Sequence, residues 1–305
     1  MRDLVILMLI TIALAWCADH VAFGPVKHNR RQRLIVCTVV IIILLAGFAG
    51  LRTRCNDTAT YRYSYKLLTE KLWEASDKSI GSNPLFNWVN YRLKMHGVST
   101  QNFLMFWAFL TVGCYFIFVH KYSENYPLTI FLLFVTGCYT FAFAGIKQAA
   151  AVGISVIATM FALKKKWLLF AAGILIAALI HPYSLMYLSV PFMAFKPWTK
   201  ITYWMLAAFI AAGFLLRPLL GTVVNITTLL GEEYTVSSFT GDGVNMFRVL
   251  VCNVPMVLSF LYRKKLFADS SEAENLAMNL TMLNGAIMFD GLFGTANYFA
   301  RLANY

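Results

Sequence analysis

The amino-acid sequence predicts an all-α, polytopic integral membrane protein. Hydrophobic residues make up 59% of the 305 residues, whereas charged residues make up only 13%, and soluble domains carry roughly 25% charged residues. The apolar residues form runs of about 14–20, which is the length of a membrane span. The runs lack the alternation of a membrane β-strand, and helices satisfy their own backbone in lipid. We therefore expect one membrane domain, residues 1–305, with about ten transmembrane or re-entrant helices.

The net charge of +12 is explained by membrane topology. Lys and Arg gather in short loops, where they mark the cytoplasmic side of a membrane protein. We therefore expect no nucleic-acid partner. All of the cysteines except Cys55 lie in apolar runs, and no CxxC pair occurs, so the sequence predicts neither a disulfide framework nor a metal site. We expect no cofactor.

The first half of the chain alternates between spans and loops as the positive-inside rule requires. A run at residues 4–16 predicts a first helix, which the basic segment 27–33 follows on the cytoplasmic side. A second run, 34–51, leads outward to an external segment, 52–101, with amphipathic helices. Further crossings are predicted at 103–120, 127–145 and 148–163, and the last of these ends at the lysines 164–166.

The apolar run at residues 167–195 is too long for one typical span and has His181 and Pro182 in its middle. Proline removes a backbone donor and disfavours helix in the residue before it. A single crossing would place Lys196 and the basic cluster 263–265 outside, whereas a turn at His181 keeps them inside. We therefore expect two short helices or a broken re-entrant pair, with His181 at the outer turn.

The last part of the chain predicts three more helices. An outward helix at 201–216 ends at Arg217 and Pro218, and a second external loop, 218–245, follows it. Runs at 246–262 and 276–293 predict the other two. The sequence stops shortly after Arg301, where another helix should begin. We therefore expect that one or more C-terminal helices are missing.

This topology collects positive side chains on the external face, which the positive-inside bias should deplete of them. Snorkelling to the interface is the alternative explanation for any one of these residues. As a set they indicate an anionic ligand, and a diphosphate fits because arginine contacts phosphate through two donors. The predicted diphosphate-binding residues are Arg52, Lys147, Arg217, Arg248 and Arg301.

Other residues suggest the chemistry of the site. His181 titrates near neutral pH and is a candidate general base for a sugar hydroxyl, with a structural hydrogen bond as the alternative. Asp57 is a candidate cap of the helix that begins at Thr58, a candidate for orienting Arg52, or both. Tyr61 and Tyr65 share a helical face and are candidates for stacking on sugar rings, although anchoring at the membrane interface is the simpler explanation.

Several short motifs occur in a defined order along the chain. Gly50–Arg52 is followed by Asp57, Tyr61 and Tyr65, and the segments 83–86 and 97–99 come next. Lys147 and Gln148 begin a later run, His181 to Ser184 follow, and 299–305 ends the chain. In order and spacing these motifs resemble the EpsG-like polymerases of bacterial exopolysaccharide synthesis, which are similar to the Wzy O-antigen polymerases. Lys147 stands where that family usually has arginine, which keeps the charge but loses the fork. Tyr183 is an extra residue within the family's His-Pro-Ser-Ala motif.

The resemblance implies a fold like that of membrane glycosyltransferases that use lipid-linked sugars. It implies a multi-pass enzyme of the bacterial cytoplasmic membrane that joins oligosaccharide repeat units carried on undecaprenyl diphosphate. The product would be an exopolysaccharide, capsule or O-antigen, made at the outer face without a metal ion. Arg52, Lys147 and Arg301 would bind the diphosphate, and His181 would act as the base with Asp57 as its orienting partner.

The partners that follow are the lipid-linked glycan, the bilayer and other polysaccharide-assembly proteins. Three alternatives stay open at this point. A transporter or flippase of a lipid-linked anionic substrate would also need basic residues and broken helices. A related membrane glycosyltransferase or glycan ligase would differ only in its acceptor. A purely structural membrane subunit would not need the external excess of positive charge.

Overall fold

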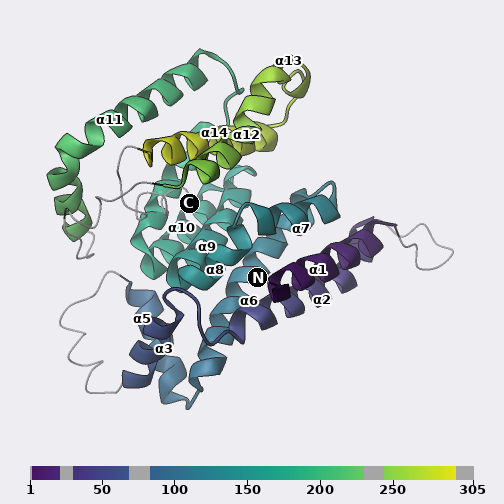
Figure 1. The fold of residues 1–305 in the computed structure, drawn as a ribbon, viewed down its shortest axis with the longest axis vertical. Helices are drawn as coiled ribbons and strands as arrows, with labels where there is room; N and C mark the ends of the chain where they lie inside the picture. The colour runs from purple at the N-terminus through teal and green to yellow at the C-terminus, as the bar shows by residue number, and fades with distance from the viewer. Residues whose placement is uncertain (1, 21–29, 69–82, 230–235, 237–243, 293–305) are drawn as a thin grey trace. The chain divides into compact units, whose positions relative to one another are not determined.

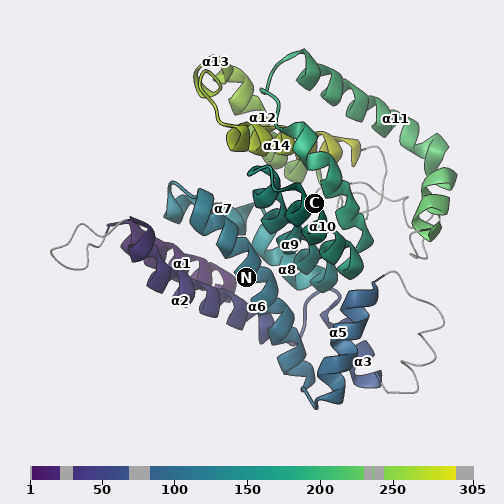
Figure 2. The same cartoon turned by 180° about the vertical axis from the view of Figure 1, so that it is seen from behind.

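The computed structural model describes residues 2–20, 30–68, 83–229, 236 and 244–292 (Figures 1 and 2). At a few helical positions, Arg217 among them, only the backbone is described. The described residues form helices and contain no strand, which confirms the all-α prediction for this part of the chain. The chain divides into two compact units, Met1–Phe161 with Trp167–Ser184 and Ala162–Lys166 with Leu185–Tyr305. We call them unit 1 and unit 2.

Most helices of unit 1 lie close to their predicted bounds. Two short helices lie in segment 52–101, α3 (Thr58–Leu67) and α5 (Pro84–Met95), and the external position of this segment stays a prediction. Residues 69–82 between them lie outside the described part. The longer helices of unit 1 are α1 (Arg2–His20), α2 (Arg30–Gly50), α6 (Thr100–Tyr122), α9 (Ile146–Ala162) and α10 (Trp167–Ile180).

The run at 127–145 is not one helix, as the sequence predicted, but two. They are α7 (Tyr126–Val135) and α8 (Cys138–Ala144), and the chain bends by 43° between them. Gly137 lies at the bend with φ of 85°, a left-handed conformation that glycine adopts without the penalty of a side chain. The break therefore depends on a single glycine inside an otherwise apolar run.

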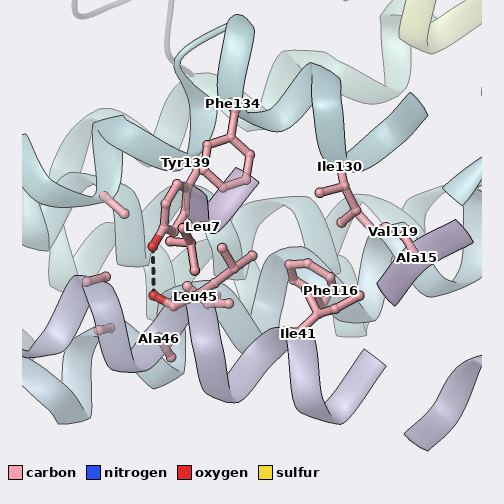
Figure 3. Packing of buried hydrophobic residues seen from close by; sticks show 14 of the residues in the cluster. Leu7, Ala15, Ile41, Leu45, Ala46, Phe116, Val119, Ile130, Phe134 and Tyr139 are labelled. Atoms are coloured by element: carbon pink, nitrogen blue, oxygen red, sulfur yellow. Dashed lines mark hydrogen bonds between the residues drawn. The ribbon is translucent and has the colours of Figure 1, made fainter. Parts of the chain in front are cut away.

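The core of unit 1 surrounds the second half of α2. Helices α1 and α2 lie side by side in both views (Figures 1 and 2). Ile41 and Leu45 of α2 are fully buried against residues of α6 and α7, among them Phe116 and Ile130 (Figure 3). Tyr139 of α8 donates a hydrogen bond of 2.8 Å to the carbonyl oxygen of Leu45. These contacts fix the last turns of α2, and the chain leaves this helix just before Arg52.

Helices α9 and α10 form an antiparallel hairpin in unit 1. Gly173 of α10 packs so closely on Ala158 of α9 that a Cβ atom at Gly173 would lie 2.7 Å from the Ala158 Cβ. Small residues permit such a close approach of helices in membranes. Because the two helices run in opposite directions, Lys147 at the start of α9 and His181 just beyond α10 lie at the same end of the hairpin.

The predicted break at His181 is confirmed. Helix α10 ends at Ile180, and a 3₁₀ helix, η1 (Pro182–Met193), begins directly after His181. The second piece is a 3₁₀ helix and not the short α-helix that the sequence suggested. Pro182 and Pro191 both lack a backbone donor, which disfavours the α-helical hydrogen-bond pattern.

Unit 2 contains α11 (Lys200–Leu229), α12 (Met246–Leu261), α13 (Arg263–Leu266) and α14 (Glu272–Asp290). Helix α14 packs on both α11 and α12. The prediction that a helix ends at Arg217 and Pro218 is wrong, and so is the first part of the predicted loop 218–245. The helix continues to Leu229 with Pro218 inside it. An interior proline does not always end a helix, because in a membrane other groups can satisfy the backbone that it frees.

Two helices, α1 and α6, are long and apolar enough to cross a membrane, and the bent pair α7 and α8 could form a third span. Five shorter apolar helices occur in the described residues. They are α9, α10 and α12 and the apolar parts of α2 and α11. These features agree with a helical membrane protein. The number of about ten spans and their inside–outside orientation stay predictions.

Candidate anion-binding site

Arg52 lies directly after α2 and is held from three directions. Its Nη1 donates a hydrogen bond to the carbonyl oxygen of Ala49 in the last turn of α2. Its Nε donates to Oγ1 of Thr58, the first residue of α3, over 2.9 Å. The guanidinium carbon also lies 5.8 Å from the centre of the Phe143 ring in α8, within cation–π range. The guanidinium therefore has a defined position between α2, α3 and α8.

This arrangement leaves much of the guanidinium available to a ligand. Arginine has five N–H donors, and within the described residues only two of them form hydrogen bonds. Arg52 also forms no ion pair with a described residue. Burial lowers the pKa of Arg52, but arginine stays protonated in proteins. A half-buried cation with unused donors is a suitable contact for an anionic oxygen.

Asp57 occupies the N-cap position of α3, as the sequence suggested, but its side chain makes no capping hydrogen bond. The side chain that accepts a hydrogen bond from Arg52 Nε, and so orients the guanidinium, is that of Thr58, the next residue. Sequence reasoning missed Thr58 because a hydroxyl at a helix start carries no sign of a partner six residues earlier. A role of Asp57 in the chemistry stays a prediction.

Lys147 and His181 lie together at the end of the α9–α10 hairpin. His181 is buried, at 5% exposure, in the turn between α10 and η1. Burial and the positive charge of Lys147 both lower the pKa of His181. The imidazole is therefore neutral near pH 7, which is the form that accepts a proton. Its ring centre also lies 5.2 Å from that of Tyr183.

The junction of α8 and α9 connects these two parts of the site. Phe143, which contacts Arg52, is four residues before Lys147, and only Gly145 separates the two helices. Arg52, Lys147 and His181 are therefore gathered at one end of unit 1. The sequence map had assigned the same three residues to one face. The side of the membrane on which this end lies stays a prediction.

The structure corrects the predicted sugar-binding role of Tyr65. Its side chain is only 3% exposed, it stacks on Phe103 at 4.3 Å, and its hydroxyl donates to the carbonyl oxygen of Val98 over 2.9 Å. A ring in this position can neither stack on a sugar nor anchor the protein at the interface. Tyr61 is half-buried with its ring edge toward Phe86, so sugar contact stays a prediction for Tyr61 alone.

The other predicted cations belong to unit 2 or lie outside the described residues, and their part in this site stays a prediction. Arg248 is exposed in the first turn of α12 and belongs to unit 2. Arg217 also belongs to unit 2, and only its backbone is described. Arg301 lies outside the described residues. Within the described part of the chain, no three His, Cys, Asp or Glu side chains gather in a set that could hold a metal ion.

The fold and the site define a helical membrane protein with a half-buried cationic site at one end of its first unit. The sequence model of the EpsG family matches residues 35–305. The chain therefore belongs to the EpsG family, which confirms the resemblance seen in the motifs. Neither a curated protein nor a solved structure matches the chain. Membership supports a membrane function in exopolysaccharide synthesis of the polymerase type.

Proposed function

We propose that this protein joins oligosaccharide repeat units carried on undecaprenyl diphosphate at the outer face of the bacterial cytoplasmic membrane. The product is an exopolysaccharide, capsule or O-antigen. Membership of the EpsG family supports the reaction class. The observation that carries the substrate class is the guanidinium of Arg52, which is half-buried, held in place and without an anionic partner among the described residues.

In the proposed reaction a hydroxyl of one lipid-linked glycan attacks the anomeric carbon of another. The new glycosidic bond forms as the bond between that carbon and the diphosphate oxygen breaks. The lipid diphosphate leaves with the electron pair, and Arg52 and Lys147 stabilise its developing negative charge. Arg301, Arg217 and Arg248 are further candidates for this role. The chemistry needs no nucleotide sugar.

His181 is the proposed base in this reaction. Burial and Lys147 lower the pKa of His181, so its imidazole is neutral near pH 7. In this form it can take the proton of the attacking hydroxyl. The proton leaves the site after the glycosidic bond has formed. Asp57 is a candidate for positioning these groups.

The test is an Arg52→Ala substitution, with Arg92→Ala as the matched control. Arg92 is an exposed arginine of α5 in the same external segment. The variants are expressed in cells that lack the native protein, and the length of the polysaccharide is measured with the protein level. We expect Arg52→Ala to reduce polymer formation by about 10²–10³-fold, as for the loss of one charge-stabilising donor. Normal chain length and amount at normal expression would contradict the proposal.

A second measurement separates a polymerase from a transporter. Purified protein in detergent micelles receives lipid-linked repeat units extracted from cells that lack it. A polymerase lengthens these glycans without a membrane, whereas a transporter leaves their length unchanged. Unchanged glycans, with a protein that thermal unfolding shows to be folded, would favour the transporter.

A further inference from the structure

Arg62 of α3, like Arg52, is connected by hydrogen bonds to the end of α2. Its Nη1 donates a hydrogen bond of 2.9 Å to Oε1 of Gln101 in α6. The amide nitrogen of Gln101 in turn donates to the carbonyl oxygen of Gly50. Arg52 binds the carbonyl oxygen of Ala49, the residue before Gly50. Arg52 is therefore bonded directly to the carbonyl oxygen of Ala49, and Arg62 is connected through Gln101 to the carbonyl oxygen of Gly50, the next residue of α2.

Helix α3 also links the two arginines. Thr58, which accepts the bond from Arg52, and Arg62 are four residues apart on this helix. Side chains at this spacing lie one above the other on one face, with Cβ atoms about 5–6 Å apart. Both arginines are half-buried, so a ligand can reach them.

The two positive charges are not compensated by a described residue. Neither Arg52 nor Arg62 forms an ion pair in the described part of the chain. The N-terminus of α3, which has no side-chain cap, adds a partial positive charge at the same place. An anion at this place could pair with both guanidinium groups.

We propose that Arg62, positioned by Gln101, forms a two-guanidinium clamp with Arg52 that binds a diphosphate, one arginine to each phosphate group. This inference rests on the proposed function for the nature of its ligand. It adds Arg62 as a binding residue and Gln101 as a positioning residue to that site. The clamp should prefer a diphosphate, because a monophosphate would engage only one of the two guanidinium groups.

The test measures the binding of three probes to the purified full chain in detergent. They are geranylgeranyl diphosphate, geranylgeranyl monophosphate and inorganic pyrophosphate. We expect the native protein to bind the lipid diphosphate at least about 10-fold more tightly than the lipid monophosphate. Arg62→Ala should abolish this preference, whereas Arg52→Ala should weaken both lipids. Arg92→Ala should change neither.

Two further variants keep the test decisive if Arg62→Ala does not fold. Arg62→Lys keeps the charge but loses the fork, so it should lose part of the preference. Gln101→Glu adds a carboxylate beside Arg62, so it should weaken diphosphate binding by about as much as the loss of Arg62. Thermal unfolding in detergent checks that each variant is folded.

The outcomes separate the clamp from the proposed function. If folded Arg62 variants keep the preference for two phosphates, the clamp is wrong, and the polymer assay on Arg52→Ala still decides the function. If the native protein binds no lipid diphosphate, the clamp is overturned with its premise. If pyrophosphate binds tightly and both arginines are needed, the clamp is supported and its ligand can be a free diphosphate. If pyrophosphate binds weakly while the lipid diphosphate binds tightly, the clamp is supported and its ligand is the lipid-linked diphosphate.

Discussion

Arg52 and Thr58 are joined by a hydrogen bond of 2.9 Å that connects the end of α2 to the first residue of α3. Thr58 is completely buried, so this bond fixes both the start of α3 and the direction of the guanidinium. The position of the cationic site therefore depends on a neutral hydroxyl and not on a carboxylate. A carboxylate bonded to Arg52 would compete with an anionic ligand, whereas a hydroxyl does not.

Replacing Thr58 by Val should reduce activity while leaving the shape of the residue nearly unchanged. The substitution removes the acceptor of Arg52 Nε, and a hydrogen bond to a charged group contributes about 1.5–3 kcal/mol. We expect the initial rate of glycan lengthening to fall by roughly 10-fold or more. Thr58→Ser keeps the hydroxyl and should stay close to the native rate. Equal rates for the Val and Ser variants would show that this bond does not position Arg52 for the reaction.

Replacing Gly50 by Ala should destabilise the protein, because α2 approaches α6 closely at this residue. A Cβ atom at Gly50 would lie 2.8 Å from the Cα atom of Met105, and backbone cannot move aside as a flexible side chain can. We expect a loss of about 1–3 kcal/mol in the free energy of unfolding, as for other overpacked sites. Thermal unfolding in detergent measures the change. Activity should fall too, since Gly50 supplies the carbonyl that holds Gln101.

Gly47, one turn earlier in α2, is the matched control for this prediction. A Cβ atom at Gly47 would have no neighbour within 4 Å. Alanine is favoured over glycine inside a helix by about 1 kcal/mol. Gly47→Ala should therefore be neutral or slightly stabilising. A similar loss of stability in both variants would mean that the α2–α6 contact is not the cause.

The folded protein should lose stability as the pH falls below the ordinary pKa of histidine, in part because of His181. Burial and Lys147 lower the pKa of His181 from its usual value of 6.5. The unfolded chain therefore takes up this proton at a higher pH than the folded chain, and protonation favours unfolding. The contribution of His181 is fully present above about pH 6.5 and is lost progressively at lower pH. His181→Asn should flatten the dependence of the unfolding temperature on pH in this range.

Lys147→Gln provides an independent check of the same pair. Without the lysine charge, the pKa of His181 should rise toward its usual value, although burial still lowers it. The loss of activity at acidic pH should then begin at a higher pH than in the native protein. The measurement is the rate of glycan lengthening against pH for both proteins. If the fall of the rate at acidic pH is the same in both proteins, His181 is not the base.

Much of the fold could be predicted because its causes are local. Apolar runs gave the approximate bounds of α1, α2, α6, α9 and α12, since each run must be helical to satisfy its backbone in lipid. The break at His181 was also predictable, because the effect of Pro182 reaches only the adjacent residues. Arg52, just after the second predicted span, pointed to the site before any contact was known.

Other features depended on residues that are distant in the sequence. Tyrosine is a residue type that often anchors a protein at the membrane interface. Tyr65 is buried instead, because its ring stacks on Phe103 and its hydroxyl donates a hydrogen bond to the carbonyl oxygen of Val98. Gly137 and Pro218 are both helix breakers by type, yet only Gly137 ends a helix here. The difference lies in whether the surroundings satisfy the backbone, which no short stretch of sequence reveals.

The sequence by itself determined the class of the protein, the order of its helices and the candidate residues Arg52, Lys147 and His181. The class and the helix order followed from the energetic cost of placing polar groups in lipid, which acts residue by residue. The candidate residues followed from this cost together with the resemblance to the EpsG-like polymerases. Only the tertiary structure decided that Thr58, and not Asp57, accepts the hydrogen bond of Arg52 Nε and that Gln101 accepts one from Arg62. These pairs connect α2, α3 and α6, and they form only after the helices have packed, because hydrogen bonds require atoms to meet at a set distance and angle.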